Sequence, residues 1–170
     1  MHWAGPDWSD DAPGDAARFA VNVARALAEA AQQAAARAVL TEVDLKGWHS
    51  TLYEGCDVPS PAYIGRFRGD AHPDLVDYEV GVGPRMPGGL PDRVGVWASE
   101  VGLQAAAFLD QLRLALHALD AAVSPGARPT AVDELQEVVA MVAIAHGELL
   151  RIQSFPIGVV QGSGGAVGRQ

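Results

Sequence analysis

Residues 56–90 interrupt a chain that elsewhere has the periodicity of α-helices. This segment is rich in glycine and proline and contains only short apolar runs, so no amphipathic helix fits it. The segments on both sides of it carry apolar residues at helical spacing. The chain is therefore expected to fold as helices that flank one irregular insert, and any strands must form near that insert.

Two helices are expected before the insert. Residues 15–39 have high helix propensity and one apolar stripe. Thr41, followed by Asp44, has the pattern of an N-cap with an acidic residue in the first turn. The helix that it opens is predicted to run to about Tyr53, and Gly55 is expected to end it.

Two more helices are expected after the insert. Asp92 can cap a third helix from Arg93 to about Ala122, and the sequence SPGARP then breaks it. Thr130 opens a fourth helix, which is apolar nearly all round. Such a helix is typical of a central, buried position.

Within the insert, YIGRFRG and DYEVGVG each suit a short strand, and DAHPDL can turn the chain between them. A two-stranded hairpin is only marginally stable alone, so it must pack against the helices. The predicted fold class is mostly α with a small β-hairpin. One domain is expected over residues 15–155, with a loose N-terminal arm at 1–14 and a glycine-rich tail at 156–170.

Composition excludes several classes of protein. The 170 residues include 12 basic and 21 acidic side chains, a formal charge of −9, which disfavours nucleic acid and anionic membranes as partners. Cys56 is the single cysteine, so no intrachain disulfide can form. No signal peptide or spanning apolar run is apparent. We expect a cytoplasmic protein, and the abundance of Ala, Gly, Arg, Val and Pro suggests a bacterial genome of high GC content.

The order of the motifs resembles the Fic (Fido-domain) family. It consists of LTEVDLKGWHSTLY, then YIGRFRG and YEVGVG, a proline-glycine loop, a long helix, and a helix ending in IAHGELLRIQSF. The resemblance covers roughly Leu40 to Phe155 and is strongest in GRFRG and AHGELLRI. It implies a Fic-like helical domain with a β-hairpin flap, in which the final helix of the family is missing.

In that family, the helix that corresponds to the fourth predicted helix ends in the loop His-Pro-Phe-x-(Asp or Glu)-Gly-Asn-Gly-Arg. The resemblance implies that the histidine accepts a proton from a protein hydroxyl, which attacks the α-phosphate of a nucleotide, usually ATP. The acidic residue holds Mg²⁺, while the glycine backbone, the following helix and the arginine bind phosphate. The product is an AMP-modified Tyr, Thr or Ser.

This chain lacks the chemical groups of that loop. Gln153 stands at the position of the base, Ile157 at that of the metal ligand, and Gln161 at that of the arginine. Glutamine accepts no proton near neutral pH, and isoleucine cannot bind Mg²⁺. Loss of the base alone lowers a rate by about 10²- to 10⁴-fold. Phe155 and Gly158 remain as remnants of the nucleotide loop, whereas Ser154, Val159 and Val160 depart from the pattern.

The leading prediction is therefore a degenerate or truncated Fic-like protein without adenylyltransferase activity, with no cofactor and no metal site expected. A frameshifted or truncated gene and a natural pseudoenzyme both explain the tail. The missing helix should leave part of the fourth helix exposed unless a homo-oligomer or a capping partner covers it. One alternative is an active transferase that uses ATP and Mg²⁺, and another is a non-catalytic interaction subunit.

The flap residues of the resemblance are Gly65, Arg66, Phe67 and Arg68. The two arginines alternate with Ile64 and Phe67, so we expect them to point away from their apolar neighbours. They could hold a target peptide by strand addition or form a solvated charged edge. The sequence favours neither interpretation.

Weaker motifs receive ordinary structural interpretations. The glycines of QGSGGAVGR are predicted to form a flexible tail rather than a nucleotide-binding turn. STLYEG matches the inhibitory pattern of Fic proteins, but Glu54 is expected to be a surface residue. We expect Cys56 to be a small filler residue rather than a nucleophile. Among the histidines, His49 and His146 are predicted to be hydrogen-bonded core residues, and His2, His72 and His117 to lie at the surface.

Overall fold

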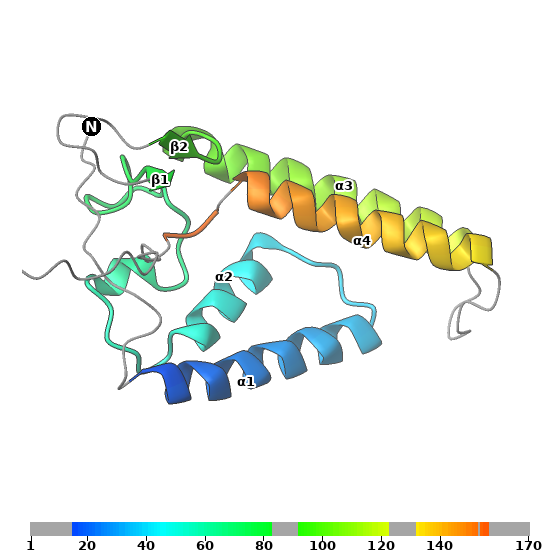
Figure 1. Cartoon of the computed structure of the whole chain (residues 1–170), viewed down its shortest axis with the longest axis horizontal. Coiled ribbons are helices and arrows are strands. Elements are labelled where there is room, and N and C mark those ends of the chain that lie inside the picture. The colour runs from blue at the N-terminus through cyan, green and yellow to red at the C-terminus, as the bar shows by residue number, and fades with distance from the viewer. Residues whose placement is uncertain (1–14, 83–91, 123–131, 153, 157–170) are drawn as a thin grey trace, which may run out of the picture.

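The computed structural model describes residues 15–82, 92–122, 132–152 and 154–156, and these residues are mostly helical, as expected (Figure 1). The N-terminal arm and nearly all of the predicted tail lie outside them. The helices are α1 (Ala16–Ala35), α2 (Glu42–Leu52), α3 (Val101–Ala122) and α4 (Val132–Ile152), with short 3₁₀ helices at Pro61–Tyr63 and Ala98–Glu100.

The first two helices follow their sequence signals closely. α1 ends at Ala35, four residues before its predicted end, because Arg37 has a φ of 54°, which a helix cannot continue. The predicted N-cap of α2 at Thr41 is confirmed, and the structure extends it to a capping box: the Asp44 amide donates to Thr41 Oγ1, and the Asp44 carboxylate accepts from the Thr41 amide. Gly55, with a φ of 71°, follows the end of α2 as predicted.

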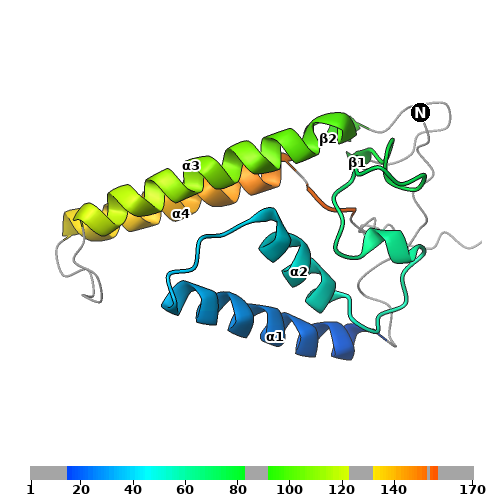
Figure 2. The same cartoon turned by 180° about the vertical axis from the view of Figure 1, so that it is seen from behind.

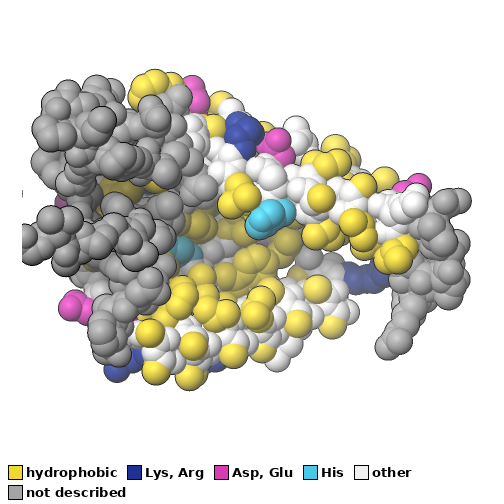
Figure 3. Space-filling view, in the orientation of Figure 1, with side chains coloured by type: hydrophobic (Ala, Val, Ile, Leu, Met, Phe, Trp, Pro, Cys, Tyr) yellow, Lys and Arg dark blue, Asp and Glu magenta, His cyan; other side chains and the backbone are white. Residues whose placement is uncertain are grey.

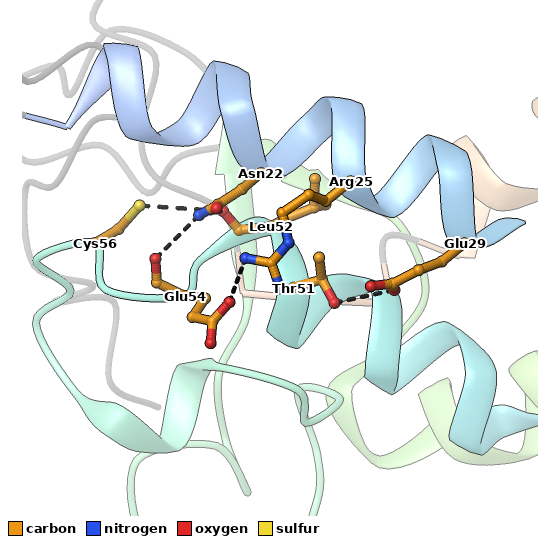
Figure 4. Close-up of polar contacts among 7 residues, drawn as sticks. All are labelled: Asn22, Arg25, Glu29, Thr51, Leu52, Glu54 and Cys56. Carbon is orange, nitrogen blue, oxygen red and sulfur yellow. Dashed lines mark hydrogen bonds and ion pairs between the residues drawn. The ribbon is translucent and has the colours of Figure 1, made fainter.

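A buried asparagine holds α1 against α2. The side-chain amide of Asn22 donates to the carbonyls of Leu52 and Glu54, at 3.0 Å each (Figure 4). These carbonyls lie at the C-terminal end of α2, where no intrahelical donor remains for them. Arg25 forms an ion pair with Glu54 beside this contact. Glu54 is exposed, in agreement with its interpretation as a surface residue.

The predicted pairing of the hairpin is wrong. Residues 63–69 form no strand, since Gly65 and Gly69 have φ angles of 66° and 86°, which break extended backbone. The strand β1 (Val80–Val82) instead pairs antiparallel with β2 (Asp92–Val94), and Val80 lies opposite Val94. The second predicted strand therefore exists, but its partner comes from the region assigned to the third helix.

The pairing of β1 with β2 also shows that the predicted start of the third helix was wrong. Asp92 begins β2 rather than capping a helix, and Gly95, with a φ of 80°, ends the strand. A 3₁₀ turn at Ala98–Glu100 then leads into α3 at Val101. The apolar spacing upstream of Val101 fits a helix, but it contains no information about pairing with a distant strand, and that pairing decides the structure of residues 92–94.

The helices form two pairs that meet at the insert. α3 and α4 lie side by side as a long arm, and α1 packs against α2 on the other side of the molecule (Figures 1 and 2). α4 is not buried by its neighbours, since many of its apolar side chains are exposed. The prediction of a central, buried fourth helix is wrong, whereas the expected exposure of part of it is confirmed. No helix in the described ranges has the length and apolar character needed to cross a membrane.

The main core lies where the arm meets the insert. Phe67, Val101, Phe108 and Ile152 are at its centre, and Phe155 packs against its edge. A smaller cluster inside the insert joins Tyr63 to Leu75. Most of the core is thus concentrated at one end of the α3–α4 arm.

We predict that Gly69→Ala strongly destabilises the fold and that Gly102→Ala does not. A Cβ at position 69 would lie 1.8 Å from the Ala98 carbonyl oxygen, at a φ that alanine disfavours, so a loss of at least about 2 kcal/mol is expected. A Cβ at Gly102, inside α3, meets no atom within 4 Å. Alanine there should raise the free energy of unfolding by about 0.5–1 kcal/mol. Urea unfolding of both variants measures the difference, and equal stabilities would contradict the close approach at Gly69.

Candidate functional site

Among the residues singled out by the Fic resemblance, Phe67, Arg68 and Phe155 lie close together at the C-terminal end of α4. The chain leaves α4 at Ile152 and continues through Ser154, Phe155 and Pro156 toward the insert segment 65–70. Ser154 and Pro156 are buried, and Phe155 is half-buried. Gln153, Gly158 and the rest of the loop pattern, from Ile157 to Gln161, lie outside the described residues.

Phe155 joins the predicted loop to the predicted flap. Its ring stacks on the imidazole of His49 at a centroid distance of 4.2 Å, and it meets the edge of the Phe67 ring at 5.0 Å. The ammonium group of Lys46 lies 4.3 Å from the centre of the same Phe67 ring. Three segments of the chain, from α2, the insert and the end of α4, therefore share one aromatic cluster.

His49 is a structural residue, as predicted. Its Nδ1 atom accepts a hydrogen bond of 3.0 Å from the Gly65 amide, which leaves the proton of the neutral ring on Nε2. Burial lowers the pKa of His49 to about 4, so the ring is neutral at neutral pH. Gly65 is needed here because a Cβ would lie 2.1 Å from Ser50 Oγ.

His146 does not behave in the same way. It was predicted to be a hydrogen-bonded core residue, but it is exposed on α4. The prediction failed because the surface of α4 that carries His146 has no neighbouring helix in the described part of the structure. His117 is exposed, as expected, and His72 is partly exposed.

Arg68 lies at the centre of the contacts between the insert, the entry to α3 and the end of α4. Its guanidinium is fully buried, and Nη2 donates to the carbonyls of Val96 at 2.5 Å and Ile152 at 2.9 Å. Nη1 forms an ion pair with Glu79 at 3.3 Å, and the other oxygen of Glu79 accepts from the Ala98 amide. The Arg68 amide also donates to the Ser154 carbonyl at 3.1 Å.

The expected alternation of the flap side chains is therefore wrong. Phe67 and Arg68 are both buried although they are adjacent, and Arg66 alone of the two arginines is exposed. The left-handed turns at Gly65 and Gly69 replace the pleat that would send successive side chains to opposite faces. Arg68 serves the fold by binding backbone carbonyls within the chain.

A second candidate place is a shallow pocket of about 350 Å³ between α1 and α2. Gln33 Oε1 and Trp48 Nε1 are buried there without hydrogen-bond partners among the described residues. The pocket also presents Glu29, which accepts from Thr51, and Asp44, whose pKa is lowered by hydrogen bonds from Thr41. No cluster of three His, Cys, Asp or Glu side chains suited to a metal occurs in the described residues.

Sequence reasoning missed two residues that organise these contacts. Asn22 was counted only as part of a helix, and Glu79 only as part of a strand. A polar side chain inside an otherwise apolar run, such as Glu79 in YEVGV, was the available signal. Cys56 is partly buried beside the end of α2, where a filler residue was expected.

No protein-family model matches this chain, and no curated protein or solved structure matches it either. The Fic resemblance therefore rests on the order of the motifs in the sequence.

We predict that Arg68→Met costs about 3–5 kcal/mol of stability, because it leaves Glu79 and two buried carbonyls without their donor. The matched control is Arg66→Met, which changes an exposed arginine two residues away and should alter stability by no more than about 0.5 kcal/mol. Chemical denaturation followed by circular dichroism measures both. A mild effect of Arg68→Met would show that its buried contacts add little to the fold.

We predict that stability falls as the pH is lowered from 6.5 to 4. Between these values the unfolded chain protonates His49 while the folded chain, with its lowered pKa, does not, so the unfolded state gains about 3 kcal/mol. Above pH 6.5 His49 is neutral in both the folded and the unfolded chain, so this loss of stability is absent there. His49→Gln should flatten this part of the pH profile, whereas His146→Gln, at an exposed position, should leave it unchanged. Identical profiles for all three proteins would disprove the role of His49.

Proposed function

We propose that this chain is a Fic-like protein that does not transfer AMP and that acts by binding another polypeptide. The support from the sequence is the order of the motifs, combined with Gln153, Ile157 and Gln161 at the positions of base, metal ligand and arginine. The proposal has two parts, the loss of AMP transfer and a binding role, and each part rests on its own observations.

The observation that carries the loss of chemistry is the packing at the end of α4. The Fic resemblance implies that this end should open toward nucleotide phosphates and Mg²⁺. Here Ser154, which departs from the family pattern, is buried together with Pro156, while Phe155, which matches the pattern, packs between His49 and Phe67. His49 does not replace the missing base, because its Nδ1 accepts from the Gly65 amide and the proton of the neutral ring lies on Nε2.

The binding role is supported by the apolar surface of the helices. Exposed hydrophobic side chains lie along the α3–α4 arm and on α1, around the hollow between them (Figure 3). Large exposed apolar surfaces mark sites of protein association. Under this proposal, the hairpin available for strand addition to a target peptide is β1–β2, and Arg66 is the exposed member of the predicted flap residues.

We predict that the purified chain, incubated with labelled ATP, Mg²⁺ and cell lysate, modifies no protein. Gln153→His should not restore activity, because the metal ligand and the phosphate contacts remain absent. Gel autoradiography and intact-mass spectrometry measure the transfer. Robust modification that is abolished by changing a residue other than Gln153 would overturn the inactive assignment and support the alternative of an active transferase.

A further inference from the structure

α4 carries two apolar stripes, and the structure covers only one of them in the described residues. The first contains Val138, Met141, Ala145 and Ile152, which are buried or half-buried against α3 and the core. The second consists of Leu135, Val139, Val142, His146 and Leu149, and every one of these residues is exposed. The apolar members of the second stripe have exposed fractions of 53%, 59%, 57% and 39% in chain order.

The spacing of the second stripe is that of a helix-packing seam. Its members are separated alternately by four and three residues, the a and d pattern of a coiled coil. At about 100° per residue, it lies about 100° around α4 from the covered stripe. A helix with two such stripes is built to contact two neighbouring helices, and α3 is one of them.

We propose that a second copy of this chain covers the exposed stripe, with the two α4 helices antiparallel about a two-fold axis at Val142. The stripe is self-complementary about that residue: Leu135 of one copy lies opposite Leu149 of the other, and Val139 lies opposite His146. A two-fold interface requires this reciprocity, because the same surface must serve both partners.

Charge supports a second copy as the occupant. Both copies carry a formal charge of −9, so their contact must be free of acidic side chains. Among the side chains of α4 that the structure describes, those around the stripe are the stripe itself with Val138, Ala143 and Leu150, none of which is charged. The described charged side chains of α4, Glu137, Glu148 and Arg151, lie on other parts of the helix surface. Depletion of charge is the compositional mark of an interface core.

The exposed area sets the expected strength of association. The four apolar side chains of the stripe, together with Leu150, would contribute at most about 400–450 Å² from each copy, or about 800–900 Å² in total. This is below the roughly 1,200–2,000 Å² of stable complexes, so the dimer should be weak and dependent on concentration. The inference rests on this stripe alone and does not depend on whether the chain transfers AMP.

Analytical ultracentrifugation of the full chain from about 1 to 500 µM tests the association. We expect a reversible monomer–dimer equilibrium that Val142→Glu abolishes, because it puts two carboxylates at the axis. Ile144→Glu is the matched control: Ile144 is 68% exposed and lies on the opposite side of α4, so the same charge there should leave the dimer intact. His146→Leu should tighten the dimer at least several-fold, because it completes the apolar stripe.

Disulfide trapping tests the geometry even if the dimer is weak. In a Cys56→Ser background, Val142→Cys should form a covalent dimer on oxidation, because the two-fold axis brings both copies of that residue together. Ile144→Cys should not. A chain that stays monomeric and gives no Val142→Cys dimer would overturn the proposal. A monomer that dimerises only after removal of residues 157–170 would also overturn it, since the C-terminal segment would then be the occupant.

Discussion

The fold depends on the buried guanidinium of Arg68. It binds the carbonyls of Val96 and Ile152 together with the carboxylate of Glu79, so one side chain joins the insert, the entry to α3 and the end of α4. The last carbonyls of a helix have no intrahelical donor, and at the buried end of α4 an apolar side chain would leave them unsatisfied. A cation at a helix C-terminus is also favoured by the helix dipole. A charged residue is therefore better suited than a hydrophobic one to this part of the core.

The structure concentrates its packing around that interaction and leaves the rest sparse. Phe67, Phe108 and Ile152 are buried near Arg68, whereas the distal parts of α3 and α4 pack chiefly on each other. Two helices side by side can bury only one stripe each, and α4 carries more apolar surface than α3 can cover. The exposed apolar surface follows directly from this arrangement. It is also the feature that most favours association with another polypeptide.

The described residues that carry the Fic resemblance serve the fold. Gly65 supplies the amide that fixes His49, and Phe155 packs between His49 and Phe67. These contacts pack Phe155 beside the core and engage Nδ1 of His49, so this imidazole does not replace the missing base. A Fic-like chain that kept its packing residues while losing its reactive side chains would have this character. We therefore favour binding over catalysis as the role of the molecule.

The sequence by itself determined the features that depend on neighbours along the chain. Helical periodicity predicted four helices, and the Thr41 N-cap and Gly55 marked the limits of α2, because capping and backbone preference act within one turn. The tertiary structure alone decided that Val80–Val82 pairs with Asp92–Val94, that Arg68 points inward, and that His146 points outward. Each of these outcomes depends on contacts between residues distant in sequence. An apolar stripe predicts that a surface can be buried, but only the arrangement of the other elements decides whether a partner within the same chain reaches it.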